Sequence, residues 1–235
     1  MASKNNDTII SGKDLGALMM EDFCPRCFWI KQKFKLPWQI FPGIFSSIDS
    51  FTKKVVHAYF DIHGKAPAWL PALSGAVKYL KVPHWSKFAR RDEATGIIVR
   101  GVLDDLFETA AGGHILPDYK TAKYTEGQDK LLPLYVGQLN AYAWVDTGFG
   151  SKVESLPLIY CEPVTDLEKW EGAFKEDGFS MGFSAKCVNI EIQPDLIPDL
   201  LLRAKQIIDL VEAPDAFDGC KDCEKATEIV LSLFR

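Results

Sequence analysis

The sequence predicts one α/β domain over residues 1–235, built on a central mixed β-sheet that is flanked by helices. Three observations predict this class. Apolar, β-prone runs of strand length occupy residues 96–100, 103–109, 115–119 and 153–160. Apolar residues recur at helical spacing over residues 194–211, and a further helix is expected over residues 131–145. Hydrophobic residues make up 47% of the chain, which is enough for a sizeable core.

The elements before this core are assigned from capping signals. Ser11, with an acidic residue three positions later, predicts the N-cap of a first helix that ends near residue 22. A strand is expected over residues 28–34. Polar residues at 46–49 are suited to cap a second helix, which should carry His57 and end near residue 64.

Three further segments are assigned more coarsely. Residues 65–95 are rich in Pro and Trp, and we expect them to form an insertion over the acidic site described next, with a short helix at residues 70–80. Residues 162–182 are expected to be helical in part. A strand is expected near residues 188–192.

The segment between residues 100 and 123 is symmetric about a turn signal. Apolar runs flank Ala111-Gly112-Gly113, so we expect an antiparallel hairpin. Asp104 and Asp118 lie seven residues on either side of Ala111, and near-opposite positions on one hairpin face have Cβ atoms ~5 Å apart. Lys120 follows Asp118 by two residues, which places both on one face of a strand.

Two carboxylates this close repel each other unless a cation lies between them. Hard oxygen ligands suit magnesium or manganese, and a fixed lysine beside them suits the charge that develops on a phosphate. The hairpin therefore predicts a metal-dependent phosphodiesterase site. The alternative is a surface hairpin whose acids and lysine form a solvated cross-strand pair.

The motifs around this hairpin resemble those of a known family. Residues 101–104 (Gly-Val-Leu-Asp), followed by residues 117–121 (Pro-Asp-Tyr-Lys-Thr), resemble the central motifs of the PD-(D/E)XK nuclease superfamily, in the form of its RecB-like branch. His57 resembles the histidine that this branch supplies from an early helix as a metal ligand. Gln138 and Tyr142 resemble its Gln-x-x-x-Tyr helix motif.

The resemblance implies a restriction-endonuclease-like core and a metal-dependent deoxyribonuclease. It implies that His57, Asp104, Asp118 and the backbone carbonyl of Tyr119 hold magnesium or manganese. Lys120 would position the attacking water, and a substrate-binding role would fall to Gln138 and Tyr142. From the residues alone, His57 can equally be a buried core histidine and Tyr142 a packing residue on an amphipathic helix.

Four of the six cysteines form two Cys-x-x-Cys pairs, Cys24 with Cys27 and Cys220 with Cys223. Two such pairs predict a four-thiolate metal site, a cap in which residues 11–35 and 214–235 are joined. Such a site can hold zinc or an iron-sulfur cluster. Cys24 and the residues before it resemble the N-terminal part of iron-sulfur members of the RecB-like branch, which implies a 4Fe-4S cluster. Those members usually bring one cysteine from the N-terminal side and three from the C-terminal side, whereas this chain offers two and two.

The net charge of −5 disfavours a protein that coats nucleic acid by charge alone, but it allows local basic patches. Candidate patches are Lys31, Lys33 and Lys35; Lys53 and Lys54; and Lys87, Arg90 and Arg91. The resemblance implies a DNA substrate, single-stranded or with free ends, as in the CRISPR-associated exonucleases, and a CRISPR integrase or a helicase as partner. No apolar run approaches a membrane span and no signal peptide is evident, so a cytoplasmic location is expected.

Two other functions stay open at this point. One is a nucleic-acid-binding adaptor that keeps the nuclease fold without turnover. The other is an unrelated metal-dependent hydrolase of small phosphoesters, which a deep closed pocket would favour.

Overall fold

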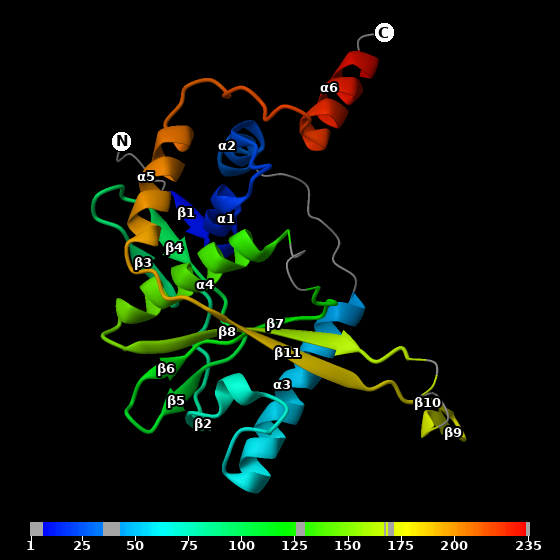
Figure 1. Cartoon of the computed structure of the whole chain (residues 1–235). Coiled ribbons are helices and arrows are strands. Elements are labelled where there is room, and N and C mark those ends of the chain that lie inside the picture. Colours follow the sequence, from blue (N-terminus) through cyan, green and yellow to red (C-terminus); the bar gives the residue numbers. More distant parts are fainter. Residues whose placement is uncertain (1–6, 35–42, 126–129, 167, 169–171, 234–235) are drawn as a thin grey trace.

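The computed structural model describes residues 7–34, 43–125, 130–166, 168 and 172–233. The described chain is an α/β protein in which mixed β-sheets are flanked by helices (Figure 1), as the sequence predicts. No helix among the described residues is long and apolar enough to cross a lipid bilayer.

The larger sheet consists of six strands in the described chain, in the order β11-β8-β6-β5-β2, with β7 also paired to β8. These strands are β2 (Ala76–Tyr79), β5 (Phe107–Thr109), β6 (His114–Ile115), β7 (Asp118–Lys120), β8 (Val153–Pro163) and β11 (Phe183–Ile190). The sheet is mixed because β8 runs parallel to β6 and β7 and antiparallel to β11. Figure 1 shows β8 and β11 leading to a small hairpin of β9 (Phe174–Lys175) and β10 (Gly178–Phe179).

A smaller, three-stranded sheet lies beside it in the described chain. It is made of β1 (Ile9–Ser11), β4 (Ile98–Arg100) and β3 (Ala89–Arg91), with β1 parallel to β4 and β3 antiparallel to it. The loop over residues 101–106 connects this sheet to β5 of the larger one. The predicted Asp104 therefore lies on a loop between two sheets and not on a strand.

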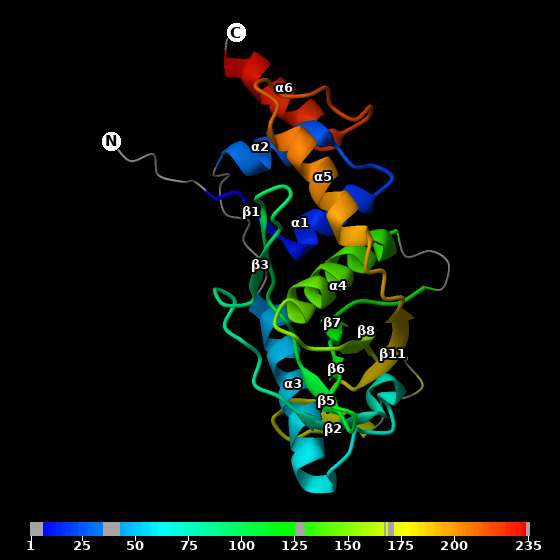
Figure 2. The same cartoon turned by 90° about the vertical axis from the view of Figure 1, so that its left-hand side faces the viewer.

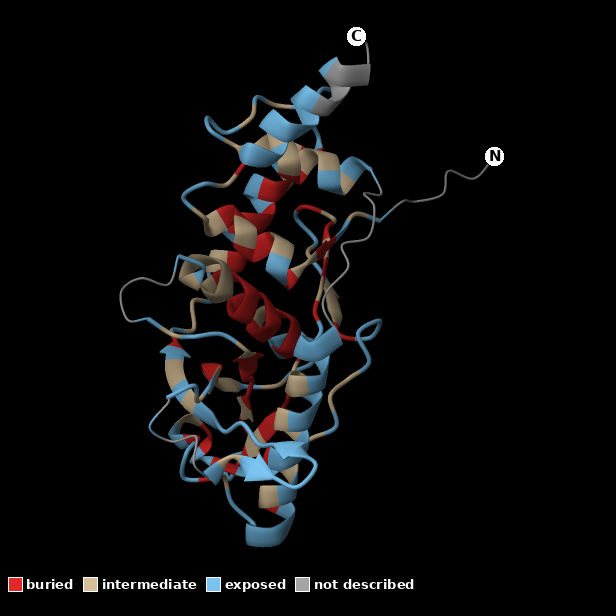
Figure 3. Cartoon of the chain, turned by 90° about the vertical axis from the view of Figure 1, so that its right-hand side faces the viewer, coloured by how far each residue is buried: buried red, intermediate tan, exposed pale blue. Residues whose placement is uncertain are grey.

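Two long helices cover opposite faces of the larger sheet, and the alternation of side chains along β8 shows how. Leu158 of β8 packs in one core cluster with Leu139 of α4 (Leu132–Thr147). The next residue, Ile159, packs in the second cluster with Phe60 of α3 (Gly43–His63). Because the centre of β8 is buried on both faces, residues 156–161 form a continuous apolar run. Figure 3 shows that the centre of α4 is buried, whereas much of α3 is exposed.

The remaining helices gather beyond α4, away from the larger sheet (Figure 2). They are α1 (Gly12–Gly16), α2 (Pro25–Lys33), α5 (Leu196–Ile208) and α6 (Lys221–Leu233), with a short 3-10 turn η1 (Ala17–Met19) after α1. Helix α1 and helix α5 contact α4, and α2 contacts both α5 and α6. The Asp14 N–H donates to Ser11 Oγ at 3.0 Å, which confirms the predicted N-cap, but α1 and η1 end at Met19, short of residue 22.

Two secondary-structure predictions are wrong. Residues 28–34 lie mostly in helix α2, because Pro25 occupies its first turn and fixes a helical φ there. Residues 70–80 contain the 3-10 turn η2 (Pro71–Leu73) and strand β2 in place of a helix. Residues 162–182, expected to be helical in part, contain the end of β8 and the hairpin of β9 and β10; residues 168 and 172 have 3-10 geometry, and residues 167 and 169–171 lie outside the described residues.

Residues 65–95, predicted to form an insertion over the acidic site, contribute one edge strand to each sheet. They supply β2, at one edge of the larger sheet, and β3, at one edge of the smaller sheet. None of them lines the pocket that contains Asp104 and Asp118.

Glycines permit the close packing of α1 against α4. A Cβ added to Gly137 would lie 2.5 Å from the Cα of Gly16, and one added to Gly16 would lie 2.2 Å from the Leu134 carbonyl oxygen. We expect Gly137→Ala to destabilise the protein by ~1–3 kcal/mol, because backbone cannot give way as a flexible side chain can. Chemical denaturation measures the loss. Gly75→Ala, where an added Cβ meets nothing within 4 Å, is the control; equal stability of both variants would contradict this packing.

Candidate active site and metal centre

Asp104 and Asp118 come together as the hairpin predicts, although the ladder ends before it reaches them. The register pairs Phe107 with Ile115, and its continuation places residue 104 opposite residue 118. Strand β7 then departs to pair with β8. The backbone N–H of Tyr119 instead donates to Asp104 Oδ2 at 2.9 Å, so the carboxylate of Asp104 contacts the open edge of β7.

Side chains from β7 and α4 surround Asp118. The Lys120 ammonium lies 2.5 Å from Asp118 Oδ2 and 4.8 Å from the ring centroid of Tyr135. Gln138 Nε2 donates to Asp118 Oδ1 at 3.0 Å and to the Tyr142 hydroxyl at 2.9 Å. The four-residue spacing places Gln138 and Tyr142 on one face of α4, as predicted.

A pocket of about 630 Å³ contains these residues. Its lining includes Asp104, Asp118, Lys120, Gln138 and Tyr142, all of which the sequence assigns to one site. Apolar and aromatic side chains complete it, among them Phe45, Val102, Leu134 and Tyr135. The structure therefore brings together every predicted catalytic or substrate-binding side chain except His57.

Burial dominates the electrostatics of Asp118. Only 3% of this residue is exposed. Loss of hydration raises the pKa of Asp118 to about 6, and the charge of Asp104 adds to the rise, whereas Lys120 acts against it. Gln138 Oε1, also buried, has no hydrogen-bond partner in the described chain. A buried carboxylate that resists ionisation and an unpartnered oxygen beside it fit the oxygen-rich environment of a hard divalent ion.

Besides Lys120, a second lysine contacts the site, and the sequence analysis did not assign it there. Lys53 of α3 lies 3.0 Å from Asp104 Oδ1 and 2.7 Å from Asp49 Oδ2. Burial lowers the pKa of Lys53, but the carboxylates of Asp104 and Asp49 outweigh it and raise the pKa overall. We expected Lys53 in a patch that contacts phosphate. Its spacing of four residues before His57 was the signal that it faces the same loop.

His57 contacts Asp105 and lies outside the residues that line the pocket. Its Nε2 is 2.9 Å from both carboxylate oxygens of Asp105, and its ring stacks on Tyr79 at 4.0 Å. Asp105 is fully buried and also accepts from the Leu106 N–H at 3.0 Å. Burial raises the pKa of Asp105 against the effect of His57. The doubled acid at positions 104 and 105 was the only sequence signal for this second contact.

The glycine of the first motif has a packing role. A Cβ on Gly101 would lie 2.8 Å from the Tyr142 ring and 2.9 Å from Phe88. A Cβ on Gly12 would also approach Tyr142 to 2.8 Å. Two glycines therefore make room for the ring of Tyr142, whose hydroxyl accepts from Gln138 and so helps to fix the amide that contacts Asp118.

Most of the predicted basic patches are engaged in contacts within the protein. Lys31 lies 2.5 Å from Asp14, and Arg91 lies 2.8 Å from Asp7. The Arg90 guanidinium lies 4.0 Å from the ring centroid of Trp144 and donates to its carbonyl. Lys35 lies outside the described residues. These contacts tie helices and strands together and do not present a row of free cations.

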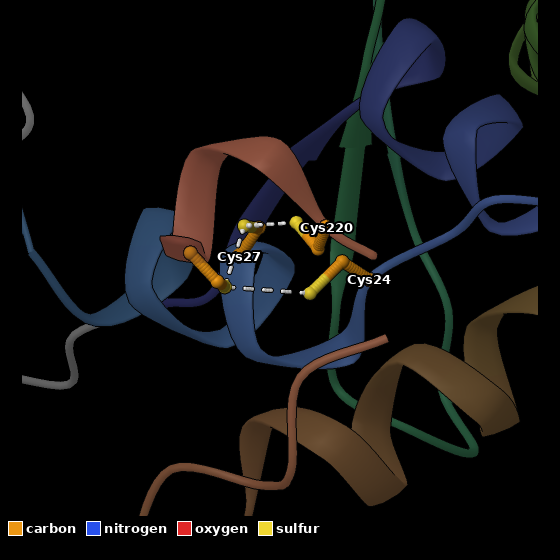
Figure 4. Close-up of side chains that lie close together, drawn as sticks. Cys24, Cys27 and Cys220 are labelled. Carbon is orange, nitrogen blue, oxygen red and sulfur yellow. Dashed lines mark hydrogen bonds between the residues drawn. The ribbon is translucent and has the colours of Figure 1, made fainter. Parts of the chain in front are cut away.

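The four cysteines of the two pairs meet, as predicted. Cys27 Sγ lies 3.6 Å from Cys220 Sγ and 3.4 Å from Cys223 Sγ, and Cys24 Sγ lies 3.7 Å from Cys223 Sγ. All four sulfurs lie within 4.8 Å of one another. In Figure 4 a dashed line joins Cys27, in the first turn of α2, to Cys220, which precedes α6. This cysteine centre could hold a metal ion and joins the two terminal regions of the described chain.

Hydrogen bonds strengthen this junction. Arg26 Nε donates to the Pro214 carbonyl at 2.8 Å, and Trp29 Nε1 donates to the Leu210 carbonyl at 3.0 Å. Although burial acts in the opposite direction, backbone N–H groups of Cys27 and Phe217 lower the pKa of Cys24 to about 7. Burial and the neighbouring sulfurs raise the pKa of Cys27. The Cys24 thiol therefore ionises more readily than the Cys27 thiol. A bound cation would favour the ionised form of both.

Comparisons with known proteins add little to this picture. No protein-family model and no curated protein matches the sequence. A solved structure described as SSO0001 is similar to this chain, with 15% sequence identity and a TM-score of 0.49. The alignment covers 89% of this chain and 81% of the SSO0001 chain. A likeness of this extent assigns neither a family nor a function.

The raised pKa of Asp118 predicts a stability change with a definite sign. In the unfolded chain this carboxyl ionises near 3.8, and in the folded protein near 6, so its ionisation costs stability as the pH rises through that interval. Without divalent ions at pH 8, Asp118→Asn should therefore be more stable than the wild type by on the order of 2 kcal/mol.

Thermal melting from pH 8 to pH 3.5 measures this difference, with the exposed Asp199→Asn as the control. The gain should disappear below about pH 4, because the wild-type carboxyl is then protonated in both states. An Asp118→Asn protein that is less stable than the wild type at pH 8 would contradict the assignment.

Proposed function

We propose that this protein is a divalent-metal-dependent deoxyribonuclease that hydrolyses phosphodiester bonds in the pocket around Asp104 and Asp118. The observation that supports it most is the convergence of Asp104, Asp118 and Lys120 with Gln138 in one pocket. This set comes from a loop, a strand and a helix, and combines metal-ligand oxygens with a fixed cation. The order of these residues along the chain is also that of the PD-(D/E)XK nucleases, which the motifs resemble.

The donor set fits magnesium or manganese. Asp104 and Asp118 would supply carboxylate oxygens, and the Tyr119 carbonyl would supply a third. In a β-strand the N–H and C=O of one residue point to the same side. The Tyr119 N–H points to Asp104, so its carbonyl is directed to that side as well. The ion would act as a Lewis acid on the scissile phosphate and lower the pKa of a water ligand.

The protein's own side chains have distinct roles in this proposal. The Lys120 ammonium, next to Asp118 and Tyr135, would hold the attacking water or stabilise charge on the phosphate. Gln138 fixes Asp118 Oδ1, and Tyr142 fixes Gln138. Phe45 lines the same pocket and is 38% exposed, which suits stacking against a nucleobase.

His57 enters the proposal through Asp105. When one ring nitrogen of a histidine donates to a carboxylate, the other is left as an acceptor with a fixed orientation. Since Nε2 of His57 contacts Asp105, Nδ1 is the ring nitrogen that would be left to bind a metal ion. Asp105 would thus position His57 without binding the ion itself.

The cysteine centre is proposed as a structural metal site that joins α2 to the start of α6. The resemblance implies a 4Fe-4S cluster, and structural zinc is the alternative. Single-stranded or free-ended DNA as substrate, and a CRISPR integrase or a helicase as partner, are proposed on the same resemblance.

Cleavage of end-labelled single-stranded DNA with added magnesium or manganese tests the proposal. The wild type should cleave. Lys120→Met and Asp104→Asn should each lose about a hundredfold or more of the rate, because each removes stabilisation of charge in the transition state. Lys152→Met is a matched control, since Lys152 is exposed and pairs with Glu154; it should cleave like the wild type.

The same assay separates the alternatives. Wild-type protein that binds DNA without cutting it at any metal concentration would indicate the adaptor. Hydrolysis of bis(4-nitrophenyl) phosphate with no cleavage of DNA would indicate a hydrolase of small phosphoesters. Full cleavage by Lys120→Met would remove this lysine from the mechanism.

A further inference from the structure

The spacing of the four thiolates defines the size of the group that they can enclose. Thiolates bind zinc at about 2.3 Å in a tetrahedron, so adjacent sulfurs are then separated by roughly 3.8 Å. Three of the six Sγ to Sγ distances in the cysteine centre are 3.4, 3.6 and 3.7 Å, and the other three do not exceed 4.8 Å. The three shorter distances fall at or just below the edge of that tetrahedron.

A four-iron cluster needs a wider site. Each of its thiolates binds a different iron at a separate corner of the cluster, so the sulfurs lie outside the cube and far from one another. In this protein all four sulfurs lie within 4.8 Å of one another. This space accommodates one ion at the centre of the four sulfurs but not a cube of four irons and four sulfides.

The local backbone explains how the sulfurs reach this arrangement. Cys24 is the N-cap of α2 and Cys27 lies in its first turn, so a spacing of three residues brings both sulfurs to one side. Cys220 and Cys223 repeat this arrangement at the start of α6. Two equivalent pairs that face each other supply four ligands, which fills the coordination sphere of a tetrahedral ion.

A backbone donor also points to bound thiolate in the cysteine centre. The Phe217 N–H donates to Cys24 Sγ at 3.4 Å. Hydrogen bonds of this kind orient a sulfur ligand and reduce its charge. Because the four cysteines fill every position, the geometry leaves no open site for a substrate or water, which is the pattern of a structural ion.

We propose that the cysteine centre binds one zinc ion per chain in place of the 4Fe-4S cluster that the family resemblance implies. The residues do not fit that cluster, and the chain also lacks the one-plus-three distribution of cysteines that accompanies it. The centre is then redox-silent and joins the two terminal regions of the described chain. This inference does not depend on the nuclease proposal.

Elemental analysis of full-length protein, expressed with both iron and zinc supplied and purified without oxygen, tests the proposal. We expect close to one zinc per chain and a colourless protein. Zinc X-ray absorption should show four sulfurs at about 2.3 Å. Cys220→Ser should lose most of this zinc, whereas Cys187→Ser, a free cysteine outside the centre, should retain it.

Other metal contents would overturn the proposal. Four irons per chain with broad absorption near ~400 nm would establish the cluster, and one iron per chain would establish a single iron site. Metal-free protein, or a zinc site with fewer than four sulfur ligands, would also contradict it. The X-ray absorption of the wild type keeps the test decisive if Cys220→Ser fails to fold.

Discussion

The candidate active site depends on one constraint, the burial of the Asp118 carboxylate between the larger sheet and α4. In this position hydration is lost, and the surrounding groups must replace it. Lys120 and Gln138 do so in part, and Tyr142 holds Gln138 in place. The pKa of Asp118 nevertheless stays raised, so the site favours either a proton or a cation. This unmet requirement supports the proposed binding of a divalent ion beside Asp118.

The rest of the fold places the partners of this carboxylate. Strand β8 fixes β7 on one side, and the free edge of β7 receives Asp104 through the Tyr119 N–H. Helix α3 approaches the loop before β5 from the other face, where Lys53 contacts Asp104 and His57 contacts Asp105. Helix α4 reaches the site because glycines in α1 and α4 allow close contact. The cysteine centre lies beyond α4 and ties the terminal regions together, so the two sites can be tested separately.

Local sequence signals predicted the features that depend on near neighbours. The symmetry about Ala111 predicted the meeting of Asp104 and Asp118, and the two Cys-x-x-Cys pairs predicted the cysteine centre. Contacts between distant segments were not visible. Asp105 pairs with His57 across 48 positions, and no spacing rule reveals such a pair. The helix at α2 was missed because Lys31 and Lys33 alternate with other residues as they would in a strand, whereas Pro25 sets the helical start.

The measurement that tests the central claim most directly is the affinity for manganese at pH 8, determined by calorimetry or by electron paramagnetic resonance. Wild-type protein should bind manganese at a site that Asp104→Asn and Asp118→Asn each weaken at least about tenfold, since each loses a charged oxygen ligand. Asp199→Asn, on the exposed face of α5, should bind like the wild type. Equal manganese affinity in the wild type and Asp118→Asn, or no binding by the wild type, would contradict the account.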